Sequence, residues 1–177
     1  PKFITDRVAT RYASVPEVLA RIGLSPSRVD YITYDHLHTQ DVRRWLGTDS
    51  EPATFPNAKL LVHRQELANV GELDPFQRDW YCPGGLSGIP RDKMIPFEGS
   101  VSLGDGIALV HTPGHTEGNH SIVVHTDDGL WVISENGISV DAYAPKLSTL
   151  WGVADYAKAI DTEVIINGNT LENSVDQ

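Results

Sequence analysis

Two histidines separated by one residue follow a short run of β-branched and aromatic residues. Tyr31 to Tyr34 has the composition of a β-strand, and His36 and His38 come directly after it. Residues two positions apart in extended chain project to the same side, so both imidazoles can reach one point in space. An isolated pair of this kind is equally typical of a polar surface loop. A third ligand elsewhere in the chain would favour a metal site.

A third histidine follows a separate predicted strand. Residues Gly106 to His111 form that strand, which ends at a Pro-Gly turn and leads to His115. Three neutral imidazoles are the ligand set of many hydrolytic zinc sites, with a fourth position left for water. The metal lowers the pKa of that water to about 7. We therefore predict that His36, His38 and His115 bind one metal ion.

The two segments together resemble the metallo-β-lactamase superfamily. Its first motif runs His-x-His-x-Asp-His and its second Thr-Pro-Gly-His-Thr-x-Gly, where this chain has HLHTQD and TPGHTEGN. In the first motif Gln40 occupies the Asp position and Asp41 the last His position. Glu135 stands where the family has a metal-bridging Asp, and Asn169 where a last His is expected. The resemblance extends from about Ser14 to Thr170.

The resemblance implies a second metal ion beside the first. Asp41 and Glu135 are the two carboxylates available to it, and both imidazoles of the family's second site are absent. Oxygen ligands favour harder ions, so we expect zinc at the three-histidine site and zinc, manganese or iron at the second. If the second site stays empty, Asp41 or Glu135 is expected to orient the nucleophilic water as a general base.

The implied activity is hydrolysis, in which metal-bound hydroxide attacks a carbonyl carbon. Lactonase-like members of the superfamily share the TPGHTEGNHS style of motif, so a lactone or another carboxylic ester is the expected substrate. A β-lactam or a thioester remains an alternative. The competing hypothesis is a metal-binding or ligand-binding relative that has lost turnover, because four of the family's metal-binding positions hold other residues.

Composition limits the classes of partner. The 177 residues, 40% of them hydrophobic, fit one domain spanning 1–177. A net charge of −10 without a basic run disfavours nucleic acid and anionic membranes, which leaves a small-molecule substrate. No apolar stretch is long enough for a membrane span, and a homodimer is compatible with the sequence. The single cysteine, Cys82, excludes an internal disulfide and favours a cytoplasmic location.

The remaining pattern predicts an αββα sandwich of mixed sheets with outer helices, in the α/β class. Since the superfamily has several strands before its first motif, we expect the natural chain to extend beyond both ends. Ser14 and Glu17 form a predicted capping box, and Asp128-Gly129 a predicted hairpin turn. Helices are predicted over Ser14–Ile22, Val42–Leu46, His63–Val70 and Val153–Ile160. Further strands are predicted over Ala58–Val62, Met94–Phe97, Gly99–Leu103, Ser121–His125, Leu130–Ile133 and Val164–Ile166.

Two further segments have open roles. Gly71 to Lys93 is rich in proline, glycine and aromatic residues, which is typical of a lid or binding loop but also of aromatic packing against the domain. His63 follows a buried strand, and we expect a structural role for it. The predicted strands end at His36 and His38, at His115, at Glu135 and at Asn169, so we expect the site along one edge of the sheets.

Overall fold

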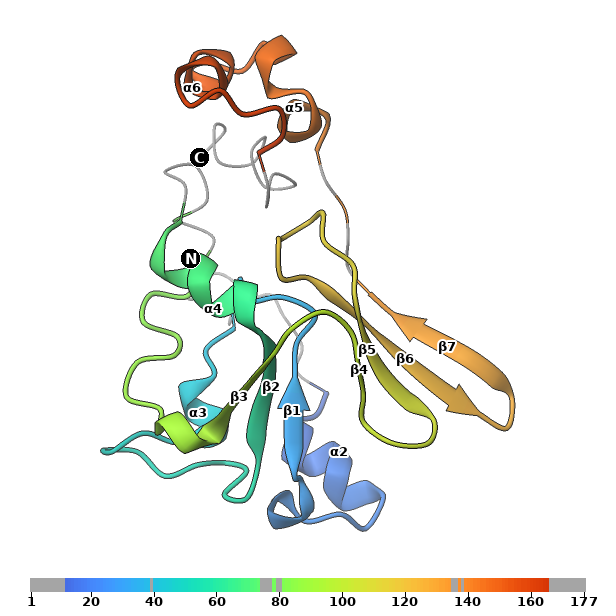
Figure 1. Ribbon diagram of the computed structural model, residues 1–177. Helices are drawn as coiled ribbons and strands as arrows, with labels where there is room; N and C mark the ends of the chain where they lie inside the picture. Colours follow the sequence, from blue (N-terminus) through green and yellow to red (C-terminus); the bar gives the residue numbers. More distant parts are fainter. Residues whose placement is uncertain are drawn as a thin grey trace.

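The fold is built from two β-sheets of different construction (Figure 1). The computed structural model describes residues 12–38, 40–73, 78, 81–134, 137 and 139–165. One sheet is parallel, with the order β1-β2-β3, and contains β1 (Tyr31–Thr33), β2 (Lys59–His63) and β3 (Met94–Phe97). The other is antiparallel, with the order β4-β5-β6-β7, and contains β4 (Val101–Ser102), β5 (Ile107–His111), β6 (His120–Thr126) and β7 (Gly129–Ile133). The predicted mixed α/β sandwich is confirmed.

Helix α2 shows how the sequence sets an element's start. The Ser14 backbone N–H donates to Glu17 Oε2 at 2.6 Å and the Glu17 N–H donates to Ser14 Oγ at 3.4 Å, which confirms the predicted capping box. Val15, Val18 and Ile22 are solvent-exposed, whereas Leu19 packs against the core. The helices are α2 (Val15–Arg21), α3 (Arg43–Leu46), α4 (Arg64–Gly71), α5 (Val140–Tyr143) and α6 (Val153–Ala159), with 3₁₀ turns at Pro26–Arg28, Arg91–Lys93 and Pro145–Leu147.

The main core lies on one face of the parallel sheet, where Leu60 and Val62 of β2 meet Val42 and Leu46 from the α3 region. Leu37 belongs to the same core although it lies in the loop after β1. Burying this leucine ties the loop to the core, and burial of a leucine contributes roughly 1.5–3 kcal/mol. The chain on both sides of Leu37 is thereby held in place.

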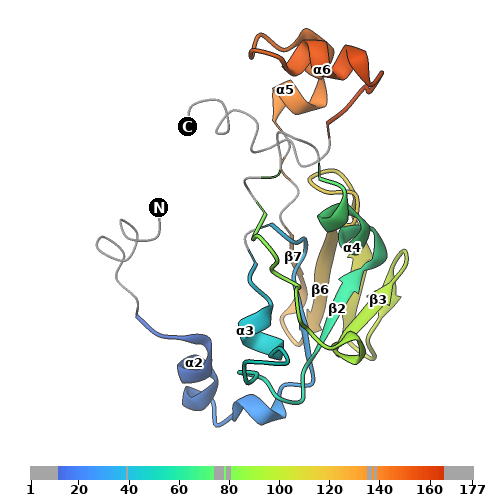
Figure 2. The ribbon, with the colours of Figure 1, turned by 90° about the vertical axis from the view of Figure 1, so that its left-hand side faces the viewer.

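The opposite face of the parallel sheet borders an apolar groove of about 650 Å³ that reaches the antiparallel sheet. Its wall includes Tyr31, Leu61, Ile95, Phe97, Val101 and Ile107. Figure 1 shows α3 on the side of the parallel sheet away from β6 and β7, and Figure 2 shows α5 and α6 beyond one end of the sheets. The described helices include none with the length and apolar character that crossing a bilayer requires.

The C-terminal part departs from the sequence-based expectation. Helices α5 and α6 pack through Ala142, Val153 and Ile165, and lie beyond the ends of the sheets in both ribbon views. Helix α5 was not predicted, because its four residues are too few to show a helical period. The strand predicted over Val164–Ile166 is not formed by its two described residues, because Ile165 packs with α5 instead and donates its N–H to the Ala142 carbonyl.

Candidate metal centre

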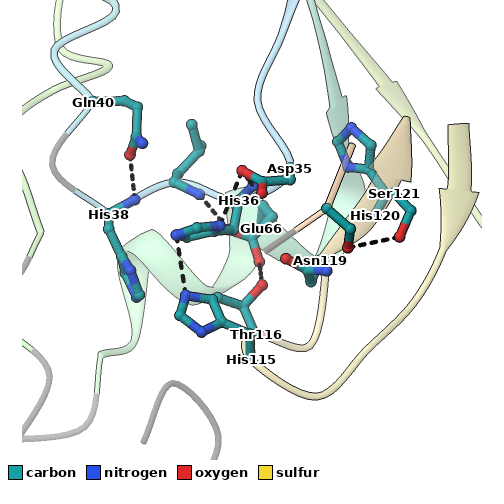
Figure 3. Close-up of polar contacts among 12 residues, drawn as sticks. Asp35, His36, His38, Gln40, Glu66, His115, Thr116, Asn119, His120 and Ser121 are labelled. Atoms are coloured by element: carbon teal, nitrogen blue, oxygen red, sulfur yellow. Dashed lines mark hydrogen bonds and ion pairs between the residues drawn. The ribbon is translucent and has the colours of Figure 1, made fainter. Parts of the chain in front are cut away.

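Two loops from different sheets bring three histidines together. His36 and His38 lie in the loop after β1, and His115 lies between β5 and β6 (Figure 3). Nε2 of His36 and Nε2 of His115 are 3.1 Å apart, and one ring nitrogen from each of the three side chains lies within 4.8 Å of the others. The structure thus places the three predicted ligands at one point. Within the described part of the chain, no other group of three such side chains is as close.

The three rings suit a metal ion in both geometry and chemistry. Their exposed fractions are 3%, 8% and 0%, and Nε2 of His38 is buried without a hydrogen-bond partner. Zinc–nitrogen bonds of about 2.0–2.1 Å in a tetrahedral site place ligand nitrogens roughly 3.3 Å apart, close to the spacing of His36 and His115. Burial, reinforced by the neighbouring His36 and His115, lowers the pKa of His38 to about 3. His38 is therefore neutral, as a ligand must be.

One ring is oriented by a hydrogen bond behind it, and a second lies beside a carboxylate. Nδ1 of His115 lies 2.8 Å from the Gly137 carbonyl oxygen and must donate to it, which leaves the Nε2 lone pair directed at the cluster. A carbonyl partner of this kind fixes the tautomer and the ring orientation of a metal-binding histidine. Nδ1 of His36 lies 3.1 Å from Asp35 Oδ1 without making a hydrogen bond to it, and the same oxygen accepts the His36 backbone N–H at 3.0 Å.

Gln40 and Asp41, which follow His38 after one intervening residue, do not join the cluster. Asp41 accepts hydrogen bonds from Nε and Nη2 of Arg43, both at 2.7 Å, and the Arg43 guanidinium holds the pKa of Asp41 below its usual range. Asp41 Oδ1 also accepts the Arg43 backbone N–H at 3.3 Å, so the carboxylate lies at the start of α3. Gln40 acts through a hydrogen bond, as expected, because its Oε1 accepts the His38 N–H at 2.6 Å.

The predicted ligand roles of Asp41 and Glu135 stay predictions. The structure does not bring Asp41 into the group of close ligand atoms, and its position suits the capping of α3. Glu135 and Asn169 lie outside the described residues. The three histidines are therefore the predicted site residues that the structure unites.

The segment from Gly71 to Lys93 contacts the histidine site through Tyr81 and Cys82, which belong to its described part. The Tyr81 ring is buried and lies edge-on to His38, with ring centroids 4.8 Å apart. The Cys82 N–H donates to the His38 carbonyl oxygen at 2.7 Å. Phe76 and Trp80, two aromatic residues of the same segment, lie outside the described residues. The segment forms a wall of the histidine site at Tyr81.

A second group of histidines lies behind the site, between the sheets. His63 caps α4 by accepting the Gln65 N–H on Nδ1, which agrees with the structural role expected for it, and its ring stacks on His111 at 4.1 Å. His120 is fully buried, with Nε2 3.0 Å from Thr33 Oγ1. Burial lowers the pKa of His120 to about 4. His120 is therefore uncharged at neutral pH.

Two residues near the ligands, Asp35 and Glu66, carry little signal of their role in the sequence. Asp35 precedes His36, and only this adjacency could have drawn attention to it. Glu66 has 1% of its surface exposed, and burial raises the pKa of its carboxyl group. In the sequence it resembles an ordinary acidic residue in the first turn of a helix, which offers no signal of burial.

Comparison with known proteins finds N-acyl homoserine lactonases that are similar to this chain in sequence. No family model matches the chain. An N-acyl homoserine lactonase from a Bacillus species is 26% identical over 113 residues, which are 64% of this chain and 40% of that protein. An N-acyl homoserine lactonase from Bacillus cereus is 25% identical over 122 residues, 69% of this chain and 40% of that protein.

Solved structures support the same fold. A probable metal-dependent hydrolase from Staphylococcus aureus has a TM-score of 0.60 at 20% identity, over 93% of this chain and 55% of that one. A variant of the Bacillus thuringiensis protein AiiA, with N-decanoyl-L-homoserine at its active site, has a TM-score of 0.52 at 20% identity, over 90% of this chain and 63% of that one. This chain spans about 40% of the length of the curated relatives that it matches. In sequence the chain is thus similar to N-acyl homoserine lactonases, and in fold it is similar to a probable metal-dependent hydrolase and to the AiiA protein.

Proposed function

We propose that this chain carries the metal site of a hydrolase that opens a lactone or another carboxylic ester. The observation that supports the proposal is the convergence of three buried imidazoles from two separate loops. One ring nitrogen from each side chain lies within 4.8 Å of the others, so a single metal ion can contact all three. Zinc is the ion that suits three nitrogen ligands best.

Residues of this chain would bind the metal ion and orient its ligands. His36, His38 and His115 would hold the ion, the Gly137 carbonyl orients the His115 ring, and the Asp35 carboxylate lies 3.1 Å from Nδ1 of His36. When bound, a divalent metal acidifies a coordinated water and polarises the substrate carbonyl. We propose Glu135 as a further ligand or as a hydrogen-bond acceptor for the attacking water. The buried ring of Tyr81 shields His38 from solvent on one side.

A lactone is the proposed substrate class. The relatives named above are N-acyl homoserine lactonases, and a related structure contains an acyl homoserine at its active site. An uncharged ester also suits a chain with a net charge of −10, because a strongly anionic substrate would be repelled.

A second candidate function is metal or ligand binding without turnover. One observation favours it: the Asp41 carboxylate pairs with Arg43 instead of joining the histidines. In that state Asp41 supplies neither a ligand for a second ion nor a general base. The three-histidine site is common to both candidates, so metal content alone does not separate them.

The test combines metal analysis with hydrolysis. The zinc-loaded chain and its His115→Ala variant are assayed for metal per chain and for proton release from an N-acyl homoserine lactone. We expect at least about one ion per chain and lactone opening that is lost in the variant. Metal retention without hydrolysis would favour the second candidate. A chain that binds no metal would contradict both.

A further inference from the structure

One buried carboxylate joins the two loops that carry the histidines. Glu66 lies in the first turn of α4, and its oxygens accept three hydrogen bonds (Figure 3). Oε2 accepts the Leu37 N–H at 2.8 Å. Oε1 accepts the Thr116 hydroxyl and, at 3.2 Å, the Gly118 N–H. A carboxylate that is 1% exposed is thus satisfied entirely by these two loops.

Two of the three hydrogen-bond donors to Glu66 come from residues next to the histidine ligands in the sequence. Leu37 stands between His36 and His38, so its N–H lies in the middle of the first ligand pair. Thr116 directly follows His115, and its hydroxyl contacts the same carboxylate. The first loop leaves the parallel sheet and the second connects two antiparallel strands. Among the described strands no pairing joins the two sheets, and the His120 N–H donates to the Asp35 carbonyl at 2.9 Å. Glu66 therefore links the loops at the residues adjacent to the ligands.

The second loop approaches α4 so closely that only glycine fits. A Cβ at Gly118 would lie 2.5 Å from the Glu66 backbone nitrogen, 2.7 Å from Glu66 Cγ and 3.0 Å from Oε1. Real Cβ atoms essentially never come within 3.0 Å of such neighbours. The Gly118 N–H can therefore reach the carboxylate only because this position lacks a side chain. Three donors also offset the desolvation that ionising a buried carboxyl group requires.

We propose that Glu66 is a positioning residue for the metal site, which fixes the two loops relative to each other so that the three imidazoles meet. The inference rests on the three-histidine site of the proposed function. Glu66 contacts neither the ion nor the substrate, and it acts through Leu37, Thr116 and Gly118. Outer partners of this kind typically change metal affinity by about 10–100-fold.

The test measures metal affinity apart from fold stability. Apo protein is titrated with Zn²⁺ against a competing chelator, and unfolding of the apo form by urea is measured separately. Glu66→Gln replaces one acceptor oxygen by an NH₂ donor, which then faces a donor of one of the loops. We expect zinc affinity to fall about 10-fold or more among folded molecules, and the visible spectrum of bound Co²⁺ to change.

Matched variants keep the test decisive. Thr116→Val removes the hydroxyl donor with little change of shape and should weaken zinc binding, whereas Thr116→Ser keeps the hydroxyl and should restore it. Thr116→Val also stands in if Glu66→Gln fails to fold. Glu98→Gln is the control, because Glu98 pairs with Arg64 at an exposed position and should leave zinc affinity unchanged.

The outcomes separate the two proposals. If wild-type protein binds zinc and the Glu66 and Thr116 variants bind it equally well, the positioning role is refuted and the metal site stands. A loss of apo stability with unchanged zinc affinity would likewise assign Glu66 to the fold alone. If the wild-type chain binds no zinc, the proposed function fails and the positioning role fails with it.

Discussion

Replacing Gly118 by alanine should destabilise the fold, because the new methyl group has no room. Its Cβ would be placed 2.5 Å from the Glu66 backbone nitrogen, so helix or loop must move by about half an ångström to reach the 3.0 Å limit. Backbone atoms cannot rotate away as a flexible side chain can. Overpacking of this kind costs roughly 1–3 kcal/mol. Urea unfolding of the apo protein measures the effect as a shift of the midpoint.

The matched control is Gly71→Ala, at the last residue of α4. A Cβ there meets nothing within 4 Å, and φ lies outside the left-handed region. Alanine has a higher helix propensity than glycine, so this variant should gain up to about 1 kcal/mol. The two Gly→Ala changes involve the same helix and should act in opposite directions. Equal midpoints for both would refute the close approach of the second loop to α4.

Three further outcomes are expected. His115→Ala should abolish zinc retention measured by elemental analysis, whereas His125→Ala, at an exposed position of β6, should leave it intact. Asp41→Asn should leave the zinc of the three-histidine site in place, since its carboxylate pairs with Arg43; loss of that zinc would show that Asp41 reaches the ion. Burial lowers the pKa of His120 from 6.5 to about 4, so the unfolded chain takes up a proton that the folded chain refuses between these values. Stability should therefore decline as pH falls through this window, and His120→Gln should remove up to about 3 kcal/mol of that decline in pH-dependent urea melts.

Local sequence signals accounted for the elements that carry the ligands. The run of β-branched and aromatic residues after Asp30 and the Pro-Gly turn before His115 predicted both loops, because short-range chemistry determines where a strand ends. The capping box of α2 followed from Ser14 and Glu17 in the same way. The local pattern could not predict that Val15, Val18 and Ile22 are exposed, because exposure depends on what the rest of the chain places against α2.

The role of Glu66 could not be predicted from the sequence for a different reason. Glu66 bonds to donors 29 and 50 residues away, at Leu37 and Thr116, and no spacing in the sequence reports such distant pairs. Asp41 presents the opposite case. The family pattern suggested a ligand, while Arg43, two residues away, offered a bidentate partner that a surface carboxylate takes readily.

The placement of the ligands on two sheets gives a bound ion the effect of a cross-link. His36 and His115 are 79 positions apart, and a single ion coordinated by both would close that length of chain into a loop. Closing a loop of such length removes on the order of 4 kcal/mol of entropy from the unfolded ensemble, by the relation used for disulfide bonds. In a chain whose one cysteine cannot form an internal disulfide, the ion would thus do for the two sheets what a disulfide does in secreted domains. Chelation should accordingly lower the melting temperature and increase hydrogen exchange most where the sheets face each other across the apolar groove.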